Sequence, residues 1–176
     1  MINIKSYFST LNKVQDIRGW DHNLHDNSEN DWICFDRARK DPAFKNRYHQ
    51  SCVIDIMKIC RKRGELDFLF IELKDLRVVS RLNDFFEKKR DNLALKIIES
   101  IGILSFFLAS SRYVDVKKFL TSKKTYYIVY NGGNRFHNHM GAIAFLSGPR
   151  LKCHVTKVAV MEWSIFCKVV SPTYCK

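Results

Sequence analysis

The sequence predicts a single α/β domain, residues 1–176, in which a mixed central sheet is flanked by helices. Residues 68–73 are almost all large and apolar, and residues 125–130 are β-branched or aromatic, so both segments are typical of buried strands. Residues 48–63 and 82–100 instead carry apolar side chains at helical spacing. With 176 residues, of which 46% are hydrophobic, the chain is long enough to bury one core.

Residues 1–31 form a variable N-terminal segment ahead of this core. Residues 4–14 are weakly amphipathic and predict a helix, whereas residues 19–31 have the composition of a loop. The histidines of that loop could ligate a metal, although histidines in a loop more often have no such role. Residues 32–35 then predict a short strand.

Two helices are expected on either side of the strand at 68–73. In the first, 48–63, basic residues crowd the last turns, where they suit the helix dipole. Its apolar stripe consists of Val53, Ile56, Met57 and Cys60. The second helix, 82–100, either ends at Gly102, which leaves 103–109 as a buried strand, or continues through that glycine.

The C-terminal part, residues 131–176, is predicted to be rich in β-structure. Strands are expected at 141–146, 153–160 and 164–170. The polar and basic connection at 110–124 has room for one turn of helix. No internal repeat divides the chain, which agrees with one domain.

The charge of the chain is strongly positive and unevenly spread. There are 30 Lys and Arg against 18 Asp and Glu, a net charge of +12. The basic residues concentrate in two segments, 37–63 and 117–176, that flank the strand at 68–73. Such a charge favours a polyanionic partner such as nucleic acid. Solvated basic faces or an anionic membrane surface would give the same balance.

Cysteine usage and the apolar segments indicate where the protein resides. The six cysteines lie far apart and form no CxxC pair, so free thiols in a reducing compartment are expected. The first ten residues lack the apolar region of a signal peptide. The longest apolar stretch, around 101–109, is too short to span a membrane. The sequence therefore predicts a cytoplasmic protein with no membrane partner.

Two charged residues interrupt the end of the apolar strand. Glu72 and Lys74 are two positions apart, so on a strand both side chains leave the same face. Burying these charges is unfavourable unless they are paired or used. One use is a carboxylate that holds a divalent cation beside a lysine that contacts a scissile phosphate. The alternative is an ordinary ion pair where the strand emerges into solvent.

This strand resembles the Glu-x-Lys half of the PD-(D/E)XK nuclease motif, and the resemblance, one of element order, covers about residues 48–130. The restriction-endonuclease-like core of that superfamily runs helix, strands carrying Asp and Glu-x-Lys, helix, then another strand. The resemblance implies that Glu72 and an aspartate bind Mg²⁺ or Mn²⁺, while Lys74 supports the attacking water. Asp67 is the nearest candidate for the aspartate, although no proline precedes it.

The choice of Asp67 requires a distortion of the strand. Five residues apart on a flat strand, Asp67 and Glu72 would face opposite sides. A bulge would bring them to one side. Otherwise Asp55 or Glu65 would serve as the second acid.

On these grounds the sequence predicts a metal-dependent nuclease, a hydrolase that cleaves the phosphodiester bonds of nucleic acid. Its expected contacts to the nucleic acid are Lys89, Lys96, Arg61, Lys62, Arg63 and His49. Lysines snorkelling from the rim of the core are the plainer interpretation of the first two. The alternative function is a non-catalytic basic module that binds nucleic acid or an acidic protein. A third is an interaction protein whose charge is incidental.

Several histidine pairs suggest other chemistry on weaker grounds. His137 and His139 would share one face of a strand and could chelate a metal, but spacing fixes no third ligand. His49 and His154 each begin a His-x-Ser/Thr triplet, as in two-histidine phosphoesterases, although His49 is expected to start a helix. No Walker A loop or dinucleotide fingerprint is present.

Overall fold

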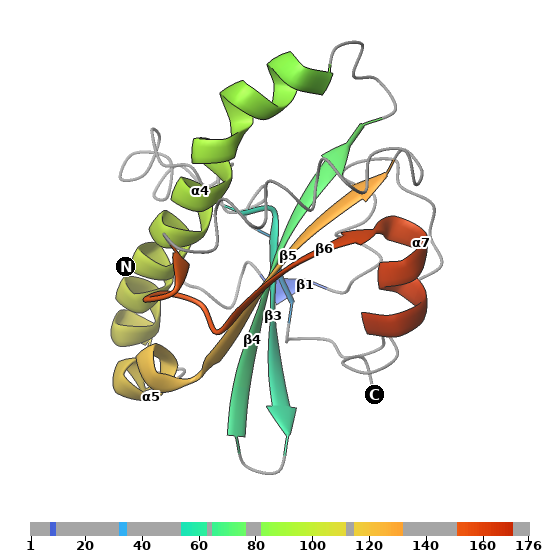
Figure 1. The fold of residues 1–176 in the computed structure, drawn as a ribbon. Helices are drawn as coiled ribbons and strands as arrows, with labels where there is room; N and C mark the ends of the chain where they lie inside the picture. The colour runs from blue at the N-terminus through green and yellow to red at the C-terminus, as the bar shows by residue number, and fades with distance from the viewer. Residues whose placement is uncertain are drawn as a thin grey trace.

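Six strands of one sheet dominate the part of the chain that the computed structural model describes, residues 8–9, 32–34, 54–62, 65–76, 82–111, 115–131 and 151–170. Strands adjacent in the sequence are adjacent in the sheet (Figure 1). In order they are β1 (Phe8–Ser9), β2 (Trp32–Cys34), β3 (Ile56–Lys62), β4 (Glu65–Asp75), β5 (Lys123–Asn131) and β6 (Lys157–Glu162). With the helices described below, this confirms the predicted mixed α/β class.

The pairing of neighbouring strands changes from antiparallel to parallel at β4. Strands β1 to β4 pair antiparallel, whereas β4 with β5 and β5 with β6 pair parallel. A parallel pair needs a crossover, which α4 (Leu82–Ser111) and α5 (Val116–Thr121) supply between β4 and β5. The C-terminal ends of β4, β5 and β6 therefore meet at one edge of the sheet, together with the N-terminal end of β3.

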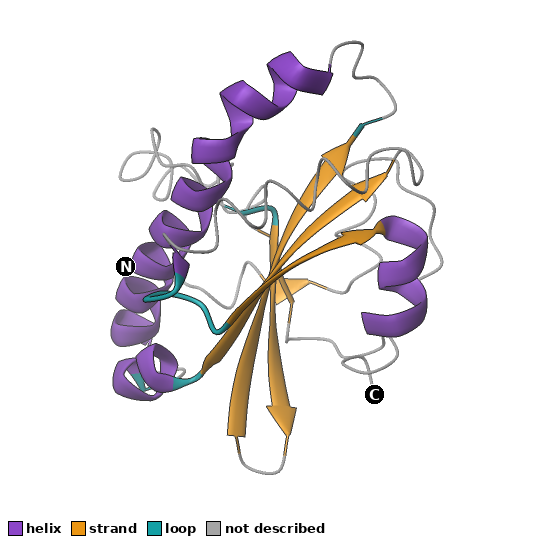
Figure 2. Cartoon of the chain, in the orientation of Figure 1, coloured by secondary structure: helices purple, strands orange, loops and turns teal. Residues whose placement is uncertain are grey.

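Both faces of the sheet are covered, which explains the apolar run of β4. Figure 2 shows α4 and α5 on one side and, on the other, the C-terminal helical segment of α7 (Trp163–Ile165) and the π-helix η3 (Phe166–Val170). Alternate residues of β4 enter the two cores: Phe68 and Phe70 on the α4 side, Leu69, Ile71 and Leu73 on the α7 side. A strand buried on both faces reads as a continuous apolar segment.

Aromatic contacts attach the helices to each face. On the α4 side, the ring of Phe119 in α5 meets that of Phe68 edge to face, with the centroids 4.8 Å apart. On the opposite side, Phe166 packs against Tyr127 of β5 and stacks on Trp163, at 5.8 Å and 5.9 Å. Such pairs add about 0.5–1.5 kcal/mol each beyond the area they bury.

The helix predicted at 48–63 is wrong over residues 56–62, which form strand β3. Ile56 and Cys60 face the α7 core, whereas Met57 and Ile59 face the α4 core. Because β3 is an interior strand, apolar residues are needed on both faces. Apolar positions 56, 57, 59 and 60 satisfy that need and also match the spacing of a helical stripe, so periodicity alone misassigns the segment.

Most of the other predicted strands and helices are confirmed, and one is corrected. The strands at 68–73 and 125–130 are confirmed, as is the short strand at 32–35 over Trp32–Cys34. The helix at 82–100 is confirmed and continues through the exposed Gly102 to Ser111, so no strand forms at 103–109. The turn of helix expected within 110–124 is α5. None of the helices described is long and apolar enough to cross a membrane.

Four further predictions need correction or lie outside the described residues. Residues 164–170, where a strand is expected, are helical. Trp163 and Phe166, three positions apart, are buried on one face of this helix, whereas the two residues between them are exposed. The strand expected at 153–160 begins only at Lys157. Phe8–Ser9 is a strand within the helix expected at 4–14. The strand expected at 141–146 lies outside the described residues. Of the cysteines that the structure describes, the buried Cys60 and the exposed Cys153 are in the thiol form.

Candidate active site

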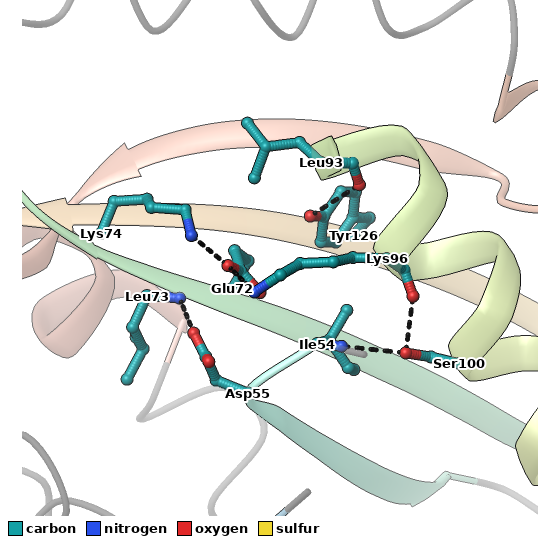
Figure 3. Close-up of polar contacts among 9 residues, drawn as sticks. All are labelled: Ile54, Asp55, Glu72, Leu73, Lys74, Leu93, Lys96, Ser100 and Tyr126. Carbon is teal, nitrogen blue, oxygen red and sulfur yellow. Dashed lines mark hydrogen bonds and ion pairs between the residues drawn. The ribbon is translucent and has the colours of Figure 1, made fainter. Parts of the chain in front are cut away.

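The site is organised around a carboxylate that is removed from solvent. Glu72 lies on β4, its side chain is 0% exposed, and it points to the same side as Phe70, towards α4. Two ammonium groups donate to a single oxygen of this carboxylate, Oε1 (Figure 3). One belongs to Lys74 on the same strand, and the other belongs to Lys96 on α4, with its Nζ 2.5 Å from Oε1.

The second oxygen of Glu72 has a different environment. Oε2 is buried and accepts no hydrogen bond from the described residues. Leaving a buried acceptor unsatisfied costs about 1–3 kcal/mol, and more when the group is charged. Hard divalent cations such as Mg²⁺ prefer carboxylate oxygens as ligands, so Oε2 is a suitable ligand for such a cation.

A second acid lies next to Glu72 at the start of β3. Asp55 directly precedes Ile56, the first residue of β3, which pairs with Ile71 of β4. Ile54 and Ile56 on either side of it face different cores, so the regular alternation of the strand begins only after Asp55. Asp55 is only 4% exposed, and its Oδ2 accepts a hydrogen bond of 2.7 Å from the backbone N–H of Leu73 (Figure 3). The Asp55 side chain thus accepts from the backbone of β4 just before β3 begins.

The structure does not bring Asp67 into this site. The register of β4 with β3 and β5 runs without interruption from Asp67 to Ile71, so no bulge is present. Asp67 therefore faces the side opposite to Glu72 and lies about 16 Å away along the strand. Glu65, at the exposed start of β4, is farther still. Of the three acids considered from the sequence, Asp55 is the one beside Glu72.

One turn of α4 contacts both acid-bearing strands. Ser100 is fully buried, and its hydroxyl accepts a 2.9 Å hydrogen bond from the N–H of Ile54, the residue before Asp55. The same hydroxyl donates to the carbonyl of Lys96 at 2.6 Å. Lys96 reaches Glu72 on β4 while Ser100, four residues later, holds the segment that leads into β3 (Figure 3). This turn therefore sets the position of Asp55 relative to Glu72.

Tyr126 of β5 lies next to the site, on the face of the sheet that α4 covers. It is fully buried, and its hydroxyl donates to the carbonyl of Leu93 on α4 at 3.2 Å. Burial raises the pKa of Tyr126 well above 10.0, and the negative charges of Glu72 and Asp55 raise it further. Both carboxylates therefore lie close enough to act on this hydroxyl.

The remaining residues predicted to contact nucleic acid are not gathered at the Glu72 site. Arg61 and Lys62 lie at the far end of β3 from Asp55, paired with Leu66 and Glu65, so any contact they make with nucleic acid would lie away from Glu72. Lys89 lies on α4 two turns before Lys96, and its side chain is outside the described residues.

The histidine pairs gain no support. His49 and Arg63 lie outside the described residues, as do His137 and His139. His154 is exposed in a turn rather than on a strand, which removes the context expected for a two-histidine phosphoesterase. No group of three or more His, Cys, Asp or Glu side chains within the described ranges is placed to hold a metal. The candidate site is therefore limited to two carboxylates, Asp55 and Glu72.

Comparisons of the chain with protein-family models, with curated proteins and with solved structures found no match. The chemistry of the site must therefore be inferred from its own residues. Two sequence signals lead to it: Glu-x-Lys at the end of an apolar strand, and Lys96 at the border of a helical stripe. Ser100 and Tyr126 carry no such signal, because a helical serine and a strand tyrosine are ordinary in those elements.

Replacing Ser100 by alanine is expected to lower the free energy of unfolding by about 1–3 kcal/mol, because the buried N–H of Ile54 loses its acceptor. Ser105→Ala is a matched control, since Ser105 also donates to the carbonyl four residues back, that of Ile101, at 2.8 Å. We expect its effect to be within about 0.5 kcal/mol. Urea unfolding of both variants measures the difference, and equal effects would contradict the role given to Ser100.

Replacing Tyr126 by phenylalanine is expected to alter the alkaline limit of stability. The folded protein retains the Tyr126 proton at pH values where the unfolded chain, with its pKa near 10.0, loses it. Tyr126 therefore contributes stability that is complete below about pH 10 and is lost above it, by about 1.4 kcal/mol per pH unit. Urea unfolding at about pH 8 and about pH 11 should show a smaller decline in the variant. An equal decline in both proteins would refute this assignment.

Proposed function

We propose that the protein is a metal-dependent nuclease with a restriction-endonuclease-like core, in which Asp55 and Glu72 hold Mg²⁺ or Mn²⁺. The observation that carries the proposal is that the Asp55 carboxylate accepts from the backbone N–H of Leu73, the residue after Glu72, while the ammonium of Lys74 donates to Glu72. The order of elements from β3 onward supports it, because the strand β3, Glu-x-Lys on β4, the helix α4 and the parallel strand β5 match the later part of the order expected of that superfamily. The helix expected at its start is strand β3 over residues 56–62. Ile54 stands where the motif has proline.

The donor set fits a hard divalent cation. Oxygen ligands from two carboxylates suit Mg²⁺ and Mn²⁺, and the buried Oε2 of Glu72 has no hydrogen-bond donor among the described residues. When bound, such an ion supplies Lewis-acid stabilisation of charge on a phosphodiester and activates water. The backbone N–H of Leu73 fixes the position of the Asp55 carboxylate by donating to Oδ2.

Lys74 has the role of orienting and stabilising the reacting groups. Its ammonium is held by Glu72, and its side chain remains 16% exposed, so it lies at the boundary between the buried carboxylate and solvent. At this boundary it can contact both an attacking water and the non-bridging oxygen of a phosphodiester. A preplaced ammonium acts most strongly where water is excluded, and Lys74 holds a carboxylate that is fully buried.

Replacing Glu72 by glutamine or Asp55 by asparagine is expected to lower cleavage by at least about 100-fold, because each change removes a charged ligand. Asp67→Asn is the matched control on the same strand, and its activity should stay near that of the wild type. Cleavage of plasmid, single-stranded DNA and RNA with Mg²⁺, with Mn²⁺ and with EDTA provides the measurement.

Binding of nucleic acid should persist in the Glu72→Gln protein, since the net charge of +12 is hardly changed. Cleavage that survives EDTA, or that is lost in Asp67→Asn but kept in Asp55→Asn, would exclude the proposed mechanism. Salt-sensitive binding by the wild type with no cleavage under any of these conditions would instead identify the non-catalytic basic module.

A further inference from the structure

Lys96 contacts Glu72, but the proposed reaction gives this lysine no role. The proposed reaction needs two acids and the lysine of Glu-x-Lys, all on β3 and β4. Lys96 instead comes from α4, and its Nζ lies 2.5 Å from Oε1 of Glu72, the oxygen that Lys74 also contacts. A second ammonium on one carboxylate oxygen leaves that oxygen fully occupied, while Oε2 accepts nothing from the described residues.

The charge of Glu72 is met without a metal ion. Lys74 and Lys96 both donate to its carboxylate, so two positive charges face one negative charge there. A divalent cation at Oε2 would lie next to these two ammonium groups, in surroundings where Glu72 and Tyr126 are fully buried. Like charges at such distances repel strongly in a medium of low dielectric constant. The ammonium groups therefore oppose the entry of a cation at Glu72.

Of the two lysines, Lys96 is the one that can leave with less change to the sheet. Lys74 lies two residues from Glu72 on the same interior strand, so its side chain leaves the sheet on the same face and starts beside Glu72. Lys96 reaches Glu72 from a helix through a long flexible stem, and its side chain is already 19% exposed. Rotation about that stem takes the ammonium to solvent without moving the backbone.

We propose that Lys96 is a placeholder cation that occupies Glu72 in the metal-free protein and weakens divalent-cation binding until it is displaced. This inference rests on the proposed function, because it assumes that Glu72 is a metal ligand. It assigns Lys96 a regulatory role at the site in place of the phosphate contact expected from the sequence alone. Removal of its charge should therefore strengthen metal binding, whereas removal of a ligand charge weakens it.

The test is direct Mn²⁺ binding without nucleic acid, measured from the electron paramagnetic resonance signal of the free ion. Lys96→Met and Lys96→Gln should each bind Mn²⁺ at least about tenfold more tightly than the wild type. Lys96→Arg, which keeps the charge, should remain within about threefold of the wild type. Lys117→Met removes the same charge from the exposed face of α5 and should also stay within about threefold.

The outcomes separate this inference from the function on which it rests. Unchanged or weaker Mn²⁺ binding in Lys96→Met and Lys96→Gln, both shown to be folded by circular dichroism, overturns the placeholder role. If the wild type then still loses Mn²⁺ on Glu72→Gln, the metal site itself stands. Equal tightening in Lys117→Met would assign the effect to net charge and also overturn it. Absence of Mn²⁺ binding in every protein overturns both proposals.

Discussion

The burial of the Glu72 carboxylate is the constraint on which the rest of the site depends. A fully buried charge on an interior strand is strongly unfavourable unless other groups neutralise it. Lys74 does so from the same strand and Lys96 does so from α4, so the acid ties the helix to the sheet. Packing against α4 in turn shields the acid from water. The charge and the helix position therefore depend on each other, and neither would be stable in this form alone.

The sheet topology explains why a second acid arrives at the same place. Because β3 runs antiparallel to β4, its first residues meet the last residues of β4, where Glu72 lies. The parallel pairing of β5 requires the chain to cross over through α4, which brings Ser100 against the entry to β3. Antiparallel pairing on one side and a helical crossover on the other thus converge on one edge of the sheet. Asp55 is positioned by this connectivity, although it is 17 residues from Glu72 in the sequence.

Sequence reasoning succeeded where one signal dominated and failed where two structures share a pattern. Residues 68–73 and 125–130 are too apolar and too β-branched for a surface helix, and α4 has a stripe too long for a strand. Strand β3 is apolar on both faces, and this pattern imitates a helical stripe. Because a residue within a helix has no register with β4, that misassignment leaves Asp55 as only an alternative to Asp67 in the sequence. Asp67 is nearer to Glu72 along the chain, but the uninterrupted pairing of β4 turns it to the opposite face.

The net charge of the chain and the charge of its candidate site serve different steps under the proposed function. A charge of +12 acts over several ångströms of solvent and favours the approach of any polyanion, so it carries no information on where chemistry occurs. Within the Glu72 site, two ammonium groups contact one carboxylate, and Asp55 is bonded to the backbone of the next residue. Under the proposed function, a divalent cation and a phosphodiester would enter this site together, since each would offset the charge that the other adds.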